Sequence, residues 1–164
     1  MTRIKLCGLT RPEDIAAANA LQPEYIGFVF AAKSKRAVSR EMAAALKAKL
    51  SPQIQAVGVF VNETPEAVAS LLNTGIIDIA QLHGQEDETY IQCLRKLTNK
   101  PLIQAVRVTD PQALQRPEKA RQTSFCWTPA QAAPARLLTG PFWTNSAAFI
   151  SSPEGLIRTR WETP

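Results

Sequence analysis

The sequence predicts a parallel α/β fold, because short strand-like runs alternate with helical patterns along most of the chain. Each run is rich in β-branched and aromatic residues, and successive runs are separated by about one helix, which is the spacing of βα units. The first three runs are almost continuously apolar, as is typical of a parallel sheet covered by helices. The runs are Ile4–Cys7, Tyr25–Phe30, Ala56–Val61, Ile79–His83 and Leu102–Val108.

Helical patterns with start signals fill the intervals between these runs. The patterns cover Pro12–Leu21, Ser39–Leu50, Pro65–Leu72 and Asp87–Leu97. Thr10 is the predicted N-cap of the first helix, since Pro12 suits the first turn and Glu13 stands at capping-box distance. The caps expected for the other helices are Ser39, Thr64 and either Gln85 or Glu86.

The composition indicates one globular domain. The 164 residues are 45% hydrophobic and 20% charged, which is ordinary for such a domain. The three cysteines have neither metal-ligand nor disulfide-scaffold spacing, and no signal peptide or membrane-spanning run is evident, so we predict a cytoplasmic protein. The net charge of +5 comes from scattered basic residues, so we expect a solvated surface and no nucleic-acid or membrane partner.

Polar residues follow the end of each strand-like run. Because the ends of parallel strands meet on one rim, these residues are expected to converge there and form a site. Each also has a plain structural interpretation, such as a packing role for the cysteine, a loop-shaping role for the asparagine or a surface position for the last arginine. The residues are Cys7, Ser34-Lys35-Arg36, Asn62, Gln81, His83 and Arg107.

Four ordered stretches resemble the phosphoribosylanthranilate isomerase family over about residues 3–108. They are Lys5-Leu6-Cys7-Gly8-Leu9-Thr10, Tyr25-Ile26-Gly27-Phe28-Val29-Phe30 with Ser34-Lys35-Arg36, Val57-Gly58-Val59-Phe60-Val61-Asn62, and Gln81-Leu82-His83-Gly84-Gln85-Glu86. The resemblance implies a (β/α)8 TIM barrel with about five βα units present. It also implies an Amadori rearrangement in tryptophan biosynthesis, without cofactor or metal, that converts N-(5-phosphoribosyl)anthranilate into 1-(2-carboxyphenylamino)-1-deoxyribulose 5-phosphate.

The same resemblance assigns roles to individual residues. The cysteine matching Cys7 is the general base, and the arginine matching Arg36 helps hold the anthranilate carboxylate. We add His83 as a second candidate substrate-binding residue. Strand alternation places Lys5 on the same side as Cys7, where a cation would favour the thiolate that a base requires.

The resemblance ends where the composition changes, after Ala120. All three tryptophans, five of the twelve prolines and no aspartate lie between Arg121 and Pro164. The family implies a sixth strand ending in Asp-Thr, whose aspartate is the general acid, then a Gly-Gly-Thr-Gly phosphate loop and an Ala-Gly-Gly-Leu segment. None is present, so we expect a partial barrel over 1–120 and an irregular tail over 121–164.

The tail carries the signature of a shifted reading frame. The codons of Trp127-Thr128 must contain GAC, an aspartate codon, when they are read one nucleotide earlier. In the same frame, residues 122–140 can encode Asp-Thr followed by Gly-Gly-Thr-Gly, and residues 151–156 can encode Leu-Ala-Gly-Gly-Leu. Two family motifs in one frame, in order, predict that the tail is a frameshift product of the last three barrel strands.

Three function classes follow from these observations. The first is an intact isomerase gene, and the second is a catalytically inactive fragment that lacks the general acid and the phosphate site. The third, a five-stranded flavodoxin-like domain, is weakened by the absence of a glycine-rich loop after the first strand. For the chain as written we expect no turnover, poor folding, an unpaired apolar edge at Leu102–Val108, and at most short helical turns in Arg121–Pro164.

Overall fold

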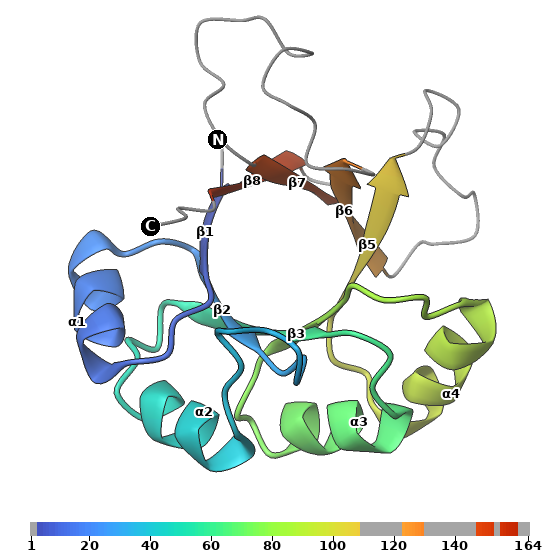
Figure 1. Ribbon diagram of the computed structural model, residues 1–164, viewed down its shortest axis with the longest axis horizontal. Helices are drawn as coiled ribbons and strands as arrows, with labels where there is room; N and C mark the ends of the chain where they lie inside the picture. Colours follow the sequence, from blue (N-terminus) through green and yellow to red (C-terminus); the bar gives the residue numbers. More distant parts are fainter. Residues whose placement is uncertain (1–2, 109–122, 130–146, 153–154, 161–164) are drawn as a thin grey trace, which may run out of the picture.

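The structure is a computed structural model that describes residues 3–108, 123–129, 147–152 and 155–160, with side chains described for 3–105. Its eight strands form a closed barrel in chain order (Figure 1). The strands are β1 Arg3–Cys7, β2 Tyr25–Val29, β3 Gln55–Phe60, β4 Ile79–Leu82, β5 Leu102–Val108, β6 Thr123–Pro129, β7 Ala147–Ser152 and β8 Gly155–Arg160. The helices are α1 Pro12–Leu21, α2 Arg40–Lys47, α3 Pro65–Asn73 and α4 Glu88–Leu97.

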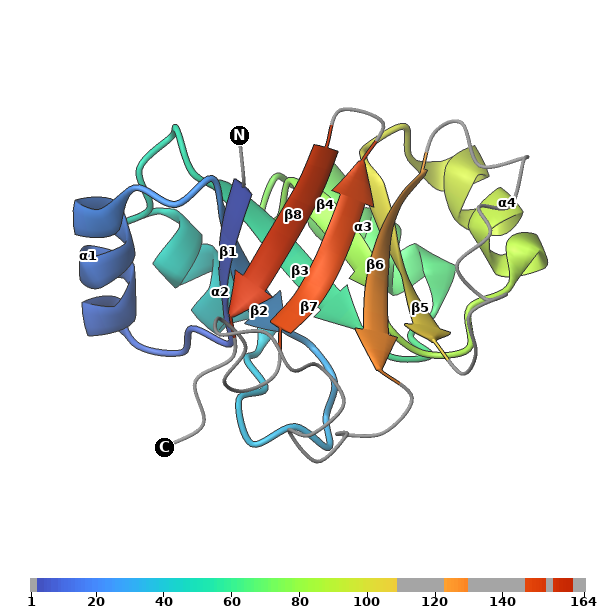
Figure 2. The ribbon, with the colours of Figure 1, turned by 90° about the horizontal axis from the view of Figure 1, so that it is seen from above.

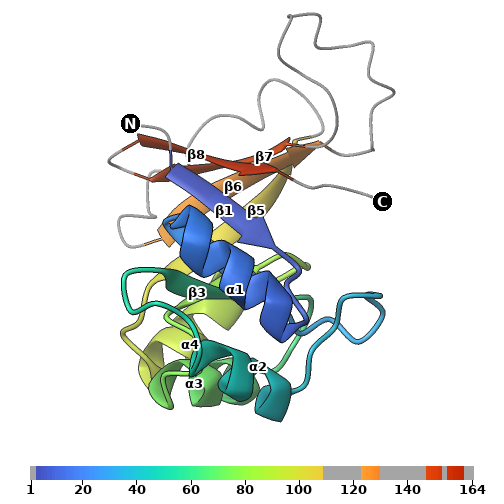
Figure 3. The same ribbon diagram turned by 90° about the vertical axis from the view of Figure 1, so that its left-hand side faces the viewer.

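The first five strands confirm the predicted parallel α/β arrangement. Neighbouring strands from β1 to β5 pair in parallel, and one helix follows each of β1 to β4. Figure 3 shows these helices on one side of the molecule and β7 and β8 on the other. None of the helices in the described part of the chain is long and apolar enough to cross a membrane.

Two helix starts differ from the prediction. The N-cap of α1 is Arg11 rather than Thr10, and the capping carboxylate belongs to Asp14 rather than Glu13. The N-cap of α4 is Asp87, whose side chain accepts a hydrogen bond from the Tyr90 backbone. Both shifts are of one or two residues, and they arise because several neighbouring side chains can cap and tertiary contacts select among them. The predicted caps of α2 and α3, Ser39 and Thr64, are confirmed.

The flavodoxin-like alternative is wrong, because the strands lie in a different order. A flavodoxin-like sheet has the order 2-1-3-4-5 and two open edges. Here β1 pairs with β2 on one side and with β8 on the other, so the order follows the chain and the sheet has no edge.

The expectation of an irregular tail with at most short helical turns is wrong at three segments, which form β6, β7 and β8. Strand β6 pairs in parallel along the whole of β5, so the predicted unpaired edge at Leu102–Val108 is also wrong. The physical reason is that the backbone N–H and C=O groups of β5 require hydrogen-bond partners. A segment with β-forming residues such as Phe125 and Trp127 can supply them as a strand. The rest of the tail lies outside the described residues.

One of these strands departs from a parallel barrel, since β7 runs antiparallel to both β6 and β8 (Figure 2). Only two residues separate Ser152 from Gly155, and a connection this short can join antiparallel strands but not parallel ones. Strand β8 then runs parallel to β1 and closes the barrel.

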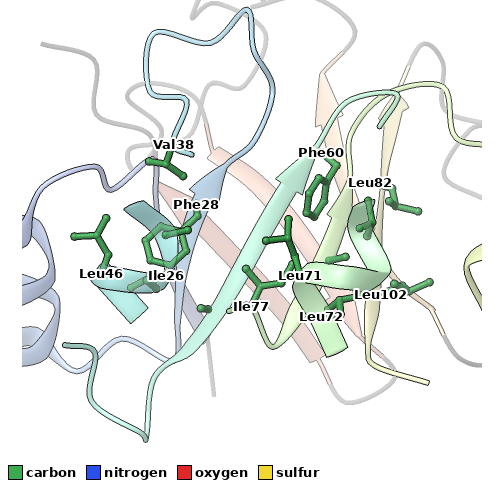
Figure 4. Close-up of a cluster of buried hydrophobic side chains, with 14 of the residues drawn as sticks. Ile26, Phe28, Val38, Leu46, Phe60, Leu71, Leu72, Ile77, Leu82 and Leu102 are labelled. Atoms are coloured by element: carbon green, nitrogen blue, oxygen red, sulfur yellow. The ribbon is translucent and has the colours of Figure 1, made fainter. Parts of the chain in front are cut away.

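Among the residues whose side chains are described, the buried apolar ones form two separate cores. The larger one lies between the strands and α1 to α4, and Figure 4 shows part of it, with Phe28 and Leu46 between β2 and α2 and Leu71 and Leu72 facing β3 and β4. The smaller one lies on the opposite face of the strands, inside the barrel. It consists of Tyr25, Val57, Ile79 and Ile103, with Ala105 packed against it.

Candidate active site

The carboxyl ends of β1 to β4 bring the predicted site residues to one rim of the barrel. Cys7 is the last residue of β1, and Arg36 lies in the loop that follows β2. Asn62 follows β3 closely, and His83 is the first residue after β4. Because these strands are parallel, all four residues belong to the same end of the barrel. Arg107 lies on β5, but its side chain is outside the described residues.

Cys7 and Lys5 lie on the interior face of β1, as strand alternation predicts. A Cβ placed on Gly27 of β2 would lie 2.4 Å from the Cys7 sulfur and 3.0 Å from Lys5 Cε. The two side chains therefore share the space that the missing Cβ leaves open, and they lie close together. Gly27 is a site residue that the strand pattern alone did not single out.

Lys5 is almost completely buried in the barrel interior. Its side chain is 1% exposed, and its ammonium donates a hydrogen bond to the side-chain oxygen of Gln81, which is itself 2% exposed. Gln81 lies on β4, so this contact spans the barrel interior from one strand to a non-neighbouring one. A buried lysine beside a cysteine supplies positive charge where a thiolate would form.

Arg36 reaches back from its loop to the end of β1. Its Nη1 donates to the backbone oxygen of Cys7 at 3.2 Å. The guanidinium packs on Gly8, whose φ of +85° suits glycine and whose missing Cβ would lie 2.7 Å from Arg36 Nη1. Arg36 is exposed, so its planar guanidinium lies at the rim, where it can bind a carboxylate with two parallel hydrogen bonds.

A buried carboxylate ties the loops after β3 and β4 together. Glu86 accepts hydrogen bonds from the backbone N–H groups of Asn62 and Gly84, both at 2.7 Å. The Asn62 side chain in turn accepts from the Gln85 backbone at 2.8 Å, and Asn62 adopts a φ of +53°. Asn62 thus shapes a loop, as its structural interpretation proposed. Glu86 was considered in the sequence only as a helix cap, because its long-range partners are invisible there.

The same carboxylate affects a neighbouring tyrosine. Burial, followed by the negative charges of Glu86, Glu63 and Glu66, raises the pKa of Tyr90 to about 12. The Tyr90 hydroxyl is buried without a hydrogen-bond partner among the described residues. Tyr90 therefore stays neutral at physiological pH and adds no charge to this side of the rim.

A backbone hydrogen bond to the neighbouring strand β3 holds His83 at the rim. Its backbone N–H donates to the Phe60 oxygen at 2.8 Å, which continues the β3–β4 ladder by one residue. Phe60 stacks on Phe30 with ring centroids 5.1 Å apart. This pair of apolar rings therefore lies where the loops after β2 and β3 begin. His83 is half-buried, and its role toward a substrate stays a prediction.

The tail does not supply the carboxylate that the resemblance implies at the end of the sixth strand. Strand β6 reads Thr-Ser-Phe-Cys-Trp-Thr-Pro from Thr123 to Pro129, with neither aspartate nor glutamate. The site as this frame encodes it thus combines a cysteine, a buried cation and an exposed arginine. It lacks an acidic group on β6.

Comparisons with known proteins agree with this geometry. The family model of N-(5'phosphoribosyl)anthranilate (PRA) isomerase matches residues 4–125. The N-(5'-phosphoribosyl)anthranilate isomerase of Endomicrobium trichonymphae is 44% identical over 110 residues, which are 67% of this chain and 54% of that protein. The chain thus spans about half the length of this curated relative.

Solved structures give the same result. The phosphoribosyl anthranilate isomerase of Thermotoga maritima matches with a TM-score of 0.66 and 33% identity, over 76% of this chain and 60% of that one. A phosphoribosyl anthranilate isomerase in complex with reduced 1-(o-carboxyphenylamino)-1-deoxyribulose 5-phosphate matches with a TM-score of 0.62 and 35% identity, over 69% of this chain and 57% of that one. The five parallel strands and their helices are therefore a half of a TIM barrel.

Proposed function

Because the chain belongs to the N-(5'-phosphoribosyl)anthranilate isomerase family, we propose that its rim site serves the Amadori rearrangement of N-(5'-phosphoribosyl)anthranilate in tryptophan biosynthesis. The observation that carries this proposal is the position of Cys7, which ends β1 beside the buried cation Lys5 and beneath the exposed Arg36. The related structure with a bound phosphosugar derivative supports a small phosphosugar as the ligand class. We place the reaction in the cytoplasm, where Cys7 stays reduced.

The chemistry gives each side chain one task. The ribose ring opens when its C1–O bond breaks, the ring oxygen gains a proton and the nitrogen becomes an iminium. The Cys7 thiolate then removes the C2 proton, and the electron pair of that C–H bond forms a C1–C2 double bond as the iminium nitrogen becomes neutral. The resulting enol gains a proton at C1 and loses the proton of its C2 hydroxyl, which gives the ketose. Arg36 holds the anthranilate carboxylate by paired hydrogen bonds, and His83 contacts the substrate at the mouth of the barrel.

The missing acid on β6 favours a second candidate function for the chain as written. Ring opening needs a proton donor at the ring oxygen, and β6 encodes no carboxylate. In this frame the chain is an inactive relative that retains the base and the carboxylate-binding arginine. We propose that turnover requires the shifted frame, in which the codons of Trp127-Thr128 encode aspartate.

The experiment uses the frame-shifted version, in which the codons from Gln122 onward are read one nucleotide earlier. Cys7→Ala is expected to lower kcat by about 10²- to 10⁴-fold, as loss of a proton-transfer group does, without loss of cooperative unfolding. Arg36→Met is expected to raise KM mainly, since the carboxylate contact exists in ground and transition states alike. Turnover is measured with N-(5'-phosphoribosyl)anthranilate.

The matched control is Lys35→Met, which removes the exposed cation next to Arg36 in the same loop. It should leave KM unchanged if the guanidinium, rather than the general positive charge of the loop, binds the substrate. A Cys7→Ala enzyme with undiminished turnover would refute the base assignment. An Arg36→Met enzyme with the same KM as the parent would remove Arg36 from the binding site.

A further inference from the structure

Gln81 is a buried polar residue of the barrel interior to which the proposed chemistry assigns no task. It lies on β4, where it pairs with Val59 of β3, and 2% of its surface is exposed. Its side-chain oxygen faces the Lys5 ammonium. Because an ammonium can only donate, the amide group must present its oxygen at this contact, which fixes the orientation of the Gln81 side chain.

The charge of Lys5 is not balanced by this contact. Lysine is almost never fully buried without a partner of opposite charge, and Gln81 is neutral. No carboxylate among the residues with described side chains forms an ion pair with Lys5, and Asp14 and Asp78 pair with Arg11 and Lys47 instead. The acidic group beside Lys5 is the thiol of Cys7, in the space opened by Gly27.

We propose that Gln81 is a positioning residue that holds the Lys5 ammonium beneath the Cys7 sulfur, so that Lys5 and the Cys7 thiolate act as a buried ion pair. The proposal rests on the proposed function, in which Cys7 is the base. Lysine has a flexible four-carbon stem, so its ammonium can move away from the sulfur unless a fixed acceptor holds it. A neutral amide suits this role because it holds the ammonium without competing with the thiolate for its charge.

Other side chains at position 81 would weaken the effect of Lys5 on the Cys7 thiolate. A carboxylate of nearly the same shape would pair with Lys5 directly and reduce the positive charge available to the sulfur. An apolar side chain of similar length would leave Lys5 charged but unheld. Gln81→Glu and Gln81→Met therefore weaken the coupling between Lys5 and Cys7 by two different routes, and both should make the thiolate harder to form.

The test measures alkylation of Cys7 by iodoacetamide across pH in the full chain, with mass spectrometry of the Cys7 peptide to separate it from the exposed Cys93. Lys5→Met, Gln81→Glu and Gln81→Met should each displace the rate profile toward higher pH, by roughly half to one pH unit. In the Lys5→Met background, Gln81→Met should add no further displacement, because Gln81 acts through Lys5.

The control is Gln104→Met, which changes the same residue type on the neighbouring strand. Gln104 donates to the Glu86 backbone oxygen rather than to Lys5, so this variant should leave the Cys7 profile unchanged. Unchanged profiles in both Gln81 variants would overturn the proposal, and so would an equal displacement by Gln81→Met with and without Lys5. If Gln81→Met does not fold, Gln81→Glu alone decides.

This readout is independent of turnover. A frame-shifted version that is inactive but shows the expected coupling would refute the isomerase function and leave the positioning role standing. An active enzyme whose alkylation profile ignores Gln81 would do the reverse.

Discussion

Gly27 provides the clearest constraint on the site at the scale of single residues. A Cβ at this position would lie 2.4 Å from the Cys7 sulfur, a separation that packed atoms do not tolerate. The glycine thus permits the Cys7 side chain to point into the barrel between β1 and β2. Its role is steric and does not depend on a positive φ.

Gly27→Ala is therefore expected to displace the Cys7 sulfur and lower kcat of the frame-shifted version by about 10²-fold, the cost of an ångström-scale misplacement. The matched control is Gly58→Ala, since Gly58 lies on the neighbouring strand and its Cβ would meet Ile77 Cδ1 at 2.6 Å in the outer core. That variant should lose about 1 to 3 kcal/mol of stability by overpacking and keep its kcat. Equal kcat losses in both variants would contradict a local role for Gly27.

The difference between Gly27 and Lys5 shows how far single residues can be predicted from sequence. Alternation along one strand predicts that Lys5 and Cys7 share a face, because both lie on β1. The contacts of Gly27 and Gln81 depend on how β2 and β4 are placed against β1, which requires the register of the whole barrel. Rim residues could therefore be named in advance, whereas their partners could not.

At the scale of elements, the start of α1 shows how one carboxylate orders the loop that follows Cys7. Asp14 accepts hydrogen bonds from the backbone N–H groups of Thr10 and Arg11, both at 3.0 Å, and from the Arg11 side chain. Burial alone would raise the pKa of Asp14, but these hydrogen bonds outweigh it and the net pKa is lowered. The carboxylate thus connects the Cys7 loop to the first helix.

Asp14→Asn is expected to cost about 1 kcal/mol at neutral pH, the usual cost of losing a helix cap. A carboxyl with a lowered folded-state pKa stabilises the fold above its unfolded pKa, and this contribution is lost as the pH falls through the folded value. The parent and the variant should therefore converge in stability under strongly acidic conditions. Urea unfolding across pH tests this, with Glu13→Gln as the control for the exposed acidic neighbour in the same turn.

Helices and strands differ in how clearly the sequence predicts them. Strands β1 to β5 and the four helices repeat one unit, so their pattern reinforces itself along the chain. Strands β6 to β8 follow no such unit, and β7 and β8 are recognisable mainly by a two-residue connection that demands antiparallel pairing. Prolines and the missing period led to the prediction of an irregular tail, whereas the backbone hydrogen bonds of β5 and β1 are satisfied by strand partners.

At the scale of the whole molecule, the described side chains separate stability from chemistry. The outer core between the strands and α1 to α4 is built from apolar side chains such as Phe28, Phe60 and Leu72 (Figure 4). The interior of the barrel also contains the buried Lys5 and Gln81. Burying polar groups there costs free energy, so a functional use of these residues is the reasonable explanation.

The last prediction compares the chain as written with the frame-shifted version. Both share residues 1–121 and hence Cys7, Lys5 and Arg36, but only the shifted frame encodes an aspartate from the codons of Trp127-Thr128. Ring opening without a proton donor should leave the chain as written without measurable turnover of N-(5'-phosphoribosyl)anthranilate. Because β6 to β8 close the barrel, the chain as written is expected to have no exposed β5 edge for aggregation. Size-exclusion chromatography, chemical unfolding and turnover of both proteins test this pair of expectations, and turnover by the chain as written would show that its tail supplies an acid from some other group.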